Sequence, residues 1–319
     1  MKKAILYNPS ITTLNLGDSI IFESVLDNIR PLLEDAFTIN VSTHLPVSGV
    51  FANLLNEADY KFVCGTNLLR NMLERRFRQW DINCFNAKKL GPCTLIGVGW
   101  QQDRFPFTPY TKHLYKTILS NDTIHSVRDE YTKKKLESIG ITNVINTGCA
   151  TMWKLTKEFC RTIPQKKAEN IVFTLTDYKP NAQKDVEIIN TLTKEYRTVY
   201  LWPQGSEDYR YATELGVLDK VKLINPTLEA YDELLMRDDI EYIGTRLHGG
   251  IRALQKKKRT LILAVDGRAT EKKKDFNLPV EIRNDMTTEK IMHLIYADRE
   301  TKVEIPEENI NLWKNQFGL

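Results

Sequence analysis

Short apolar runs alternate with stretches of helical periodicity along almost the whole chain. Continuous apolar runs are typical of strands buried on both faces of a parallel sheet, and apolar residues three and four apart are typical of helices that cover it. The alternation therefore predicts an α/β protein. The predicted strands cover 4–7, 37–41, 60–64, 94–98, 123–126, 144–147, 171–175, 198–202, 221–224, 241–243 and 260–265; the predicted helices begin near Asp18 and cover 50–57, 68–77, 186–196, 208–215, 228–236, 251–255 and 306–316.

The alternation stops once, over residues 156–169, where the chain is polar and basic and shows no period. We interpret this segment as a linker between an α/β domain over 1–155 and a second one over 170–300. Residues 301–319 then carry a terminal helix that can pack back on the first domain. With 319 residues, 42% of them hydrophobic, the chain can form two cores. The predicted fold is two doubly wound, Rossmann-like domains with parallel sheets facing across a cleft.

A glycine-rich loop, Gly244-Thr245-Arg246-Leu247-His248-Gly249-Gly250, joins a predicted strand to a helical pattern. In extended backbone, residues i and i+2 point to one side, so Arg246 and His248 would share a face. Glycines allow a ligand to approach closely, and a strand end that feeds a helix N-terminus suits an anion. The pattern predicts a phosphate or carboxylate site. The alternative is a structural turn in which Arg246 pairs with an acid and His248 is packed.

A second loop, Asn15-Leu16-Gly17-Asp18, lies where the first predicted strand gives way to the first helix. This is the mouth of an open α/β sheet, where ligands bind. Asp18 either caps the helix or faces the cleft, and the sequence leaves both roles open. Farther along, Arg128 and Asp129 precede a helical segment, where a salt bridge and a helix cap are the favoured interpretation.

Charge and composition narrow the classes of partner. The formal net charge of +4 is too small to indicate nucleic acid. It suits small anionic substrates and leaves weak peripheral association with a membrane open. No apolar run approaches the roughly 20 residues of a membrane-spanning helix. Five cysteines without a CxxC pair are typical of reduced thiols. We expect a cytoplasmic protein, with the inner face of the membrane as an open alternative; the oligomeric state is not indicated.

The run Gly-Thr-Arg-Leu-His-Gly-Gly-Ile-Arg-Ala-Leu, followed by a basic turn and an apolar strand, resembles the C-terminal signature of polysaccharide pyruvyl transferases. Segments 15–18 and 126–129 are also similar to that family. Two positions depart from it. Only Gly65 remains where the family has a glycine cluster, and Cys149 stands where an Asp is common. The second departure concerns the junction between the domains more than the chemistry.

The resemblance implies a GT-B-like architecture and transfer of the pyruvyl group of phosphoenolpyruvate to a sugar of a cell-surface polysaccharide or its precursor, as a cyclic ketal. It places the acceptor on the first domain and the donor on the second. Arg246 would hold the donor's anionic groups and His248 would transfer the proton. Asp18, from the opposite domain, would orient or deprotonate the acceptor hydroxyl. The remaining expected substrate-binding residues are Asn15, Gly17, Asn67, Arg128, Gln204, Gly244, Thr245, Gly249 and Arg268.

This scheme uses no cofactor and no metal, and the sequence has no DxD or HExxH motif. Its partners are a small-molecule donor and a saccharide acceptor; the sugar, its linkage and any lipid carrier are not indicated. One alternative is a GT-B glycosyltransferase that uses a nucleotide-sugar. Such an enzyme usually has a ribose-binding acid after the phosphate loop, and residues 251–258 contain none. The other alternative is a homologue that binds sugar phosphates without catalysis.

Overall fold

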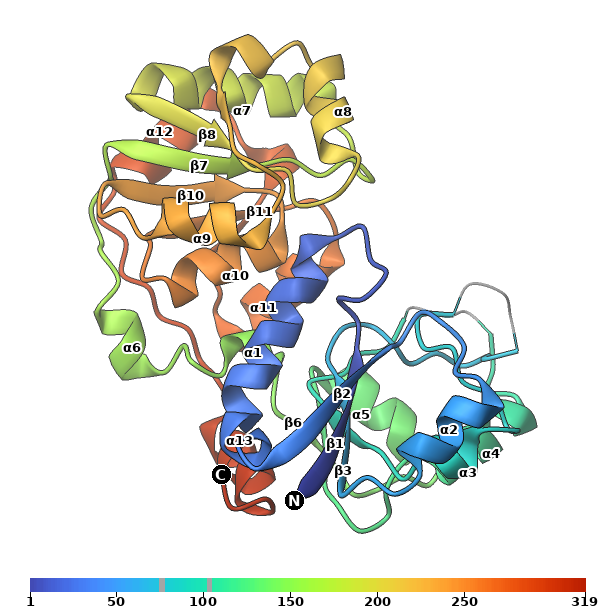
Figure 1. Cartoon of the computed structure of the whole chain (residues 1–319). Coiled ribbons are helices and arrows are strands. Elements are labelled where there is room, and N and C mark those ends of the chain that lie inside the picture. Colours follow the sequence, from blue (N-terminus) through green and yellow to red (C-terminus); the bar gives the residue numbers. More distant parts are fainter. Residues whose placement is uncertain (75–77, 102–104) are drawn as a thin grey trace. The chain divides into compact units, whose positions relative to one another are not determined.

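The structure is a computed structural model that describes residues 1–74, 78–101 and 105–319, apart from the side chain of Arg268. The chain forms two compact units. The first consists of Met1–Thr13, Ile21–Trp153 and Pro306–Leu319, and the second of Leu14–Ile20 and Lys154–Ile305. Each unit has its own parallel sheet (Figure 1). No helix in the described ranges is long and apolar enough to cross a bilayer.

The sheet of the first unit has the order β2-β1-β3-β4, with all pairs parallel. A parallel pair β5-β6 continues it, because Val98, just after β4, bridges to Val127 at the end of β5. The order reverses direction between β1 and β3. The strands are β1 (Lys2–Asn8), β2 (Ala36–Ser42), β3 (Tyr60–Cys64), β4 (Thr94–Ile96), β5 (His125–Val127) and β6 (Val144–Asn146).

Helices surround this sheet: α1 (Leu16–Leu33, whose first turn is assigned to the second unit), α2 (Gly49–Leu55), α3 (Ala87–Leu90), α4 (Pro109–Ile118), α5 (Glu130–Glu137) and α13 (Glu307–Asn315). The terminal helix α13 is held by aromatic packing. The ring of Trp313 is fully buried and lies 5.6 Å from that of Trp153 and 6.3 Å from that of Phe62, between centroids. Residues 306–319 therefore complete the core of the first unit.

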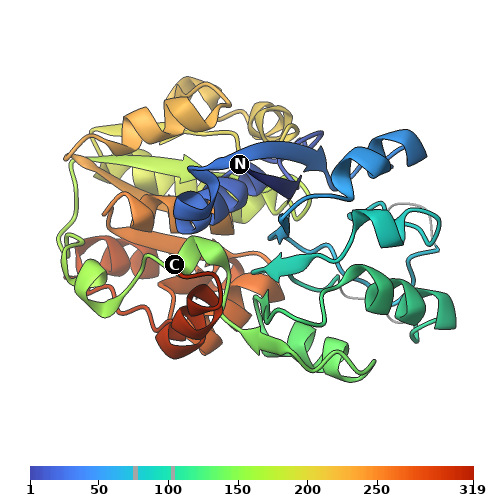
Figure 2. The same ribbon diagram turned by 60° about the horizontal axis from the view of Figure 1, so that its bottom comes forward.

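The sheet of the second unit has the order β12-β11-β10-β7-β8-β9 and is entirely parallel. Every residue of its central strands β7, β10 and β11 is buried, as expected for strands covered by helices on both faces (Figure 2). The strands are β7 (Asn170–Thr174), β8 (Thr198–Leu201), β9 (Lys222–Leu223), β10 (Ile240–Gly244), β11 (Thr260–Ala264) and β12 (Val280–Ile282). The helices are α6 (Lys157–Arg161), α7 (Ala182–Glu195), α8 (Asp208–Glu214), α9 (Leu228–Leu235), α10 (Leu247–Gln255), α11 (Gly267–Phe276) and α12 (Thr288–Tyr296).

The predicted mixed α/β class with parallel sheets is confirmed, and one local prediction is wrong. The helix predicted over 68–77 is absent from 68–74, and 75–77 lie outside the described residues. There the backbone extends the sheet instead: the N–H of Leu69 donates to Gly99 O (3.1 Å) and the N–H of Gln101 donates to Leu69 O (2.7 Å). The segment predicted as a linker contains helix α6, whose N-cap Thr156 accepts from the N–H of Phe159 (3.2 Å).

Candidate functional site

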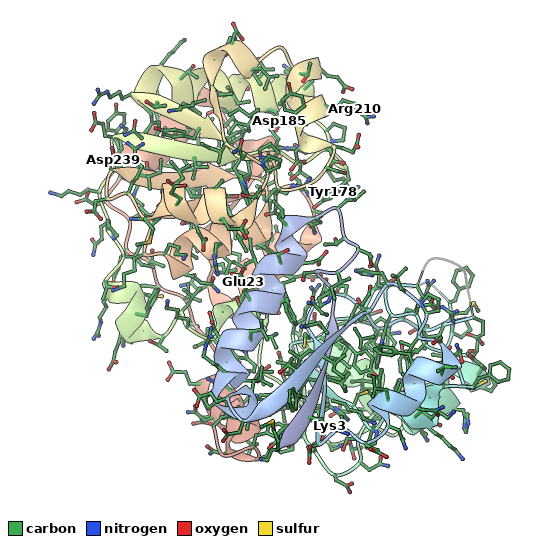
Figure 3. The ribbon with its side chains drawn as sticks, viewed as in Figure 1. Lys3, Glu23, Tyr178, Asp185, Arg210 and Asp239 are labelled. Atoms are coloured by element: carbon green, nitrogen blue, oxygen red, sulfur yellow. The ribbon has the colours of Figure 1, made fainter. Side chains whose placement is uncertain are left out.

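The chain order of the second sheet reverses between β7 and β10. Strands β8 and β9 lie on one side of this point, and β11 and β12 on the other. In open parallel sheets, ligands bind at the carboxyl ends of the strands that flank such a reversal. Tyr178, after β7, is at this end of the sheet, whereas Asp239, before β10, is at the opposite end (Figure 3). The loops after β7, β8 and β10 are therefore the candidate site.

Arg246, at the end of the β10 loop, is buried in ion pairs. Its side chain is 6% exposed. Its Nε donates to Leu175 O (2.9 Å) and to Asp208 Oδ2 (3.0 Å), while its Nη2 donates to Asp177 Oδ1 (2.7 Å) and to Asp208 Oδ1. Two carboxylates thus oppose one guanidinium. This is the structural alternative that the sequence left open for Arg246: the side chain ties together the loops after β7, β8 and β10.

Asp208 is the main partner of Arg246, and both groups are buried. Burial raises the pKa of Asp208, whereas Arg246 and the N–H groups of Gln204, Gly205 and Asp177 donate to its charged form. Burial also lowers the pKa of Arg246, but hydrogen bonds and charge from Asp208 outweigh this and raise it above its ordinary value. Because so many donors surround the carboxylate, we assign the pair as ionised.

Helix α10 begins at Leu247, so Arg246 is its N-cap and His248 lies in its first turn. The extended segment from which a shared face of Arg246 and His248 was predicted is therefore absent: the extended backbone ends at Arg246, and His248 is helical. The side chain of Arg246 makes no capping hydrogen bond to this helix within the described part of the chain. His248 is half-buried at the positive end of the helix dipole, where an anion is stabilised.

Two loop glycines are required by close packing. A Cβ on Gly244 would collide with the side chain of Thr174, and one on Gly250 would collide with Ile262. Thr245 is also structural, because its hydroxyl contacts that of Thr176 (2.8 Å) and donates to Thr174 O (3.1 Å). Close packing of α10 on the sheet thus accounts for much of the motif.

Residues 14–20, including Asp18, belong to the second unit, which corrects the expectation that Asp18 comes from the opposite domain. The N–H of Leu16 donates to Gln204 O (2.9 Å), and Asn15 forms an antiparallel bridge with Gly205. Asn15 Oδ1 accepts from Gln204 Nε2 (2.9 Å). The first turn of α1 is therefore fastened to the loop after β8, with Asp18 half-buried within it.

Gln204 joins the N-termini of two helices. Its side chain lies between Gly17 in the first turn of α1 and Gly249 in the first turn of α10. A Cβ at these glycines would lie 2.9 Å from Gln204 Nε2 and 3.1 Å from Gln204 Oε1. Gln204 is 4% exposed, and within the described residues its Oε1 has no hydrogen-bond donor. Two positive helix ends, carrying Asp18 and His248, thus converge on one buried amide, an arrangement that suits a multiply charged anion.

Three further predicted binding residues are Asn67, Arg128 and Arg268. Asn67 and Arg128 belong to the first unit, where their side chains both cover Gly99 at the carboxyl end of β4. The structural interpretation of the 128–129 pair is confirmed: Arg128 Nε lies 3.4 Å from Asp129 Oδ2, and Asp129 caps α5 by accepting from the N–H of Thr132 (2.8 Å). Arg268 is in α11, and its side chain lies outside the described part.

Sequence reasoning missed Asp177 and Asp208, the two acids that neutralise Arg246. Both follow predicted strands, and acids at adjacent carboxyl ends of a parallel sheet are close in space. That signal, set beside Arg246 at a third strand end, could have predicted the ion pairs.

Comparisons with solved structures concern the fold. The fold is similar to that of S. aureus MnaA in a co-structure with UDP, with a TM-score of 0.50 and 13% identity over 99% of this chain and 97% of the other. It also matches Methanocaldococcus jannaschii UDP-GlcNAc 2-epimerase in complex with UDP-GlcNAc and UDP (TM-score 0.49, 12% identity, all of both chains). The first likeness supports a GT-B-like fold. Among curated proteins, no significant match was found.

The sequence profile of polysaccharide pyruvyl transferases matches residues 15–267. This range begins at Asn15, whose side chain accepts from Gln204, and includes all of α10, so it contains the cluster around Gln204. It also covers well over half of the chain. The protein therefore belongs to the polysaccharide pyruvyl transferase family.

Proposed function

We propose that the protein transfers the pyruvyl group of phosphoenolpyruvate to two hydroxyls of a sugar in a polysaccharide or its precursor, releasing phosphate and forming a cyclic ketal. The observation that carries the proposal is the convergence of two helix N-termini on Gln204, with His248 on one helix and Asp18 on the other. Family membership supports pyruvyl transfer onto polysaccharide as the reaction class.

The donor has a carboxylate and a phosphate on adjacent atoms. In this proposal, backbone N–H groups in the first turn of α10 bind these anions, because a helix N-terminus carries both orphan donors and partial positive charge. The first-turn N–H groups of Leu16, Gly17 and Asp18 in α1 already donate to Gln204 and Asn15, so α1 contributes the positive end of its dipole. Arg246 acts indirectly: its charge is engaged by Asp177 and Asp208, and it fixes the loops from which α10 starts. This replaces the direct donor-binding role expected from the sequence.

The reaction begins with proton transfer to the vinyl CH₂ carbon of phosphoenolpyruvate, and His248 supplies the proton. Positive charge then develops at C2, which a sugar hydroxyl attacks while Asp18 accepts its proton. Loss of phosphate regenerates an electrophilic C2. The second hydroxyl of the sugar adds to it and gives its proton to His248, which became neutral in the first step. One pyruvyl group enters the sugar, one phosphate leaves, and no oxidant or reductant is needed.

We also propose a cytoplasmic location. The five cysteines are free thiols; Cys84 is exposed and the other four are buried. Free thiols of this kind fit a reducing compartment. The absence of a metal requirement stays a prediction; in the described parts of the chain, no three His, Cys, Asp or Glu side chains gather as a metal site would require.

Ligand-dependent thermal stability tests the donor assignment. A ligand that binds only the folded protein at 100 times its Kd adds about 2.7 kcal/mol to the free energy of unfolding. We expect phosphoenolpyruvate to raise the melting temperature and UDP- or GDP-sugars to leave it unchanged. Stabilisation by a nucleotide-sugar alone would replace the proposal with a glycosyltransferase function.

A further inference from the structure

Five large apolar side chains are exposed together on the first unit, around helix α2. The exposed fractions are 84% for Val50, 38% for Phe51, 54% for Leu54, 51% for Leu45 and 89% for Phe85. The segment 45–54 and Phe85 are adjacent, because α2 packs against α3 (Figure 1). In addition, Asn86 Nδ2, next to Phe85, donates to Val47 O (2.7 Å). We call these five residues the α2 patch.

Folding of the first unit does not explain the α2 patch. Helix α2 already buries its inner face, because Ala52 and Leu55 are fully buried, and Ser48 caps its N-terminus. Val50 and Leu54 are one helical turn apart on the other side and face solvent. Contiguous apolar surface of this kind marks an interaction site, since isolated exposed apolar residues are common but clusters are not.

Within the two segments that carry the α2 patch, the charged residues are lysines. Residues 43–55 contain no Asp, Glu, Lys or Arg, and residues 82–90 contain Lys88 and Lys89 but no acid. The neighbouring acids in sequence are already paired: Glu57 lies 3.5 Å from Lys3, and Asp81 lies 2.6 Å from Arg78. Lys88 is exposed. Apolar side chains bordered by lysines are suited to the headgroup region of an anionic membrane.

We propose that the α2 patch binds the surface of an anionic lipid bilayer. Val50, Leu54 and Phe85 enter the interface between headgroups and acyl chains, and Lys88 contacts lipid phosphates. Such binding would bring the protein to an acceptor carried on a lipid. That consequence rests on the proposed function, whereas membrane binding by the α2 patch does not.

Vesicle flotation with the full chain tests the proposal. We expect the wild type to float with vesicles of phosphatidylcholine and phosphatidylglycerol and to bind pure phosphatidylcholine much more weakly. Phe85→Ser and Val50→Ser should each reduce binding about tenfold, because each removes one inserted apolar side chain. Lys88→Glu and high salt should reduce binding to the anionic vesicles only.

Phe37→Ser is the matched control, since Phe37 is 66% exposed on β2 of the same unit and outside the α2 patch. It should leave vesicle binding unchanged. Melting temperatures of all variants should equal that of the wild type. Pyruvyl transfer to a water-soluble acceptor should also be unaffected, so failure of membrane binding and failure of the proposed reaction are separate results.

Two outcomes would overturn the proposal. One is a wild type that binds neither kind of vesicle, or whose binding is the same after Phe85→Ser and Val50→Ser. The other is self-association in sedimentation that Phe85→Ser abolishes while vesicle binding is absent. The α2 patch would then be an interface between copies of the chain.

Discussion

Replacing Arg246 with methionine removes the guanidinium and keeps a side chain of similar length. Asp177 and Asp208, with side-chain exposures of 27% and 2%, would then face each other without a cation. Breaking a buried pair by removing one partner typically costs about 3–5 kcal/mol, because it leaves an uncompensated buried charge. At roughly 2–4 °C per kcal/mol for a unit of this size, the melting temperature should fall by about 6–20 °C.

The assay is thermal unfolding of Arg246→Met beside a matched control, Arg210→Met. Arg210 lies on α8, its side chain is 71% exposed, and its partners Glu207 and Glu214 are also exposed. Surface pairs of this kind contribute about 0–1 kcal/mol, so the control should melt within a few degrees of the wild type.

Arg246→Lys distinguishes the structural role from direct donor binding. Lysine keeps the charge but lacks the planar fork that reaches Asp177, Asp208 and Leu175 O together. We expect a lower melting temperature, with the apparent KM for phosphoenolpyruvate within a few-fold of the wild type below that temperature. Normal melting combined with a KM raised tenfold or more would refute the structural role.

Three further predictions concern other groups. His248→Gln should lower kcat about 10²–10⁴-fold, while donor binding stays within a few-fold of the wild type. The control His293→Gln, on α12, should leave kcat unchanged, and wild-type turnover in His248→Gln would exclude His248 as the proton donor. Activity should survive EDTA, and a loss that Mg²⁺ restores would reveal a metal site. Burial lowers the pKa of His125 to about 4, so the free energy of unfolding of the first unit should fall by about 3 kcal/mol between pH 6.5 and 4. Denaturation of the wild type and of His125→Gln across this pH range checks the prediction.

The direction of the pH effect follows from the contacts of His125. Its Nδ1 accepts from the N–H of Leu95 (3.2 Å) and its Nε2 donates to Ser120 O (2.9 Å), which fixes the neutral ring. The unfolded chain therefore binds a proton at higher pH than the folded one, and stability is lost as pH falls through the folded pKa. His125→Gln should lack this acid-dependent loss. An unchanged slope in that variant would mean that another group is responsible.

The strands were predictable because buried parallel strands are continuous apolar runs. The wrong helix over 68–77 shows where apolar spacing alone misleads. Leu68, Leu69 and Leu73 are fully buried, but they fill the core from irregular backbone that extends the sheet. Strand β12 was not predicted, since only one of its three residues is buried and its apolar signal is weak.

The site was predictable only in part. The motif around His248 marked the carboxyl edge of the second sheet, because glycines at a strand end are visible in sequence. The partners that set the role of Arg246 are far away along the chain, at separations of 38 residues for Asp208 and 69 for Asp177. Gln204 and Asn15 are separated by 189 residues, so their contact depends on tertiary structure alone.

Turnover with phosphoenolpyruvate tests the proposed function most directly. Purified protein is incubated with phosphoenolpyruvate and a panel of sugar acceptors, and phosphate and product mass are measured together. The proposal predicts one phosphate released per pyruvyl ketal formed, dependent on His248. Sugar transfer from a nucleotide-sugar would contradict it. So would binding of phosphoenolpyruvate without release of phosphate in the presence of any of the acceptors.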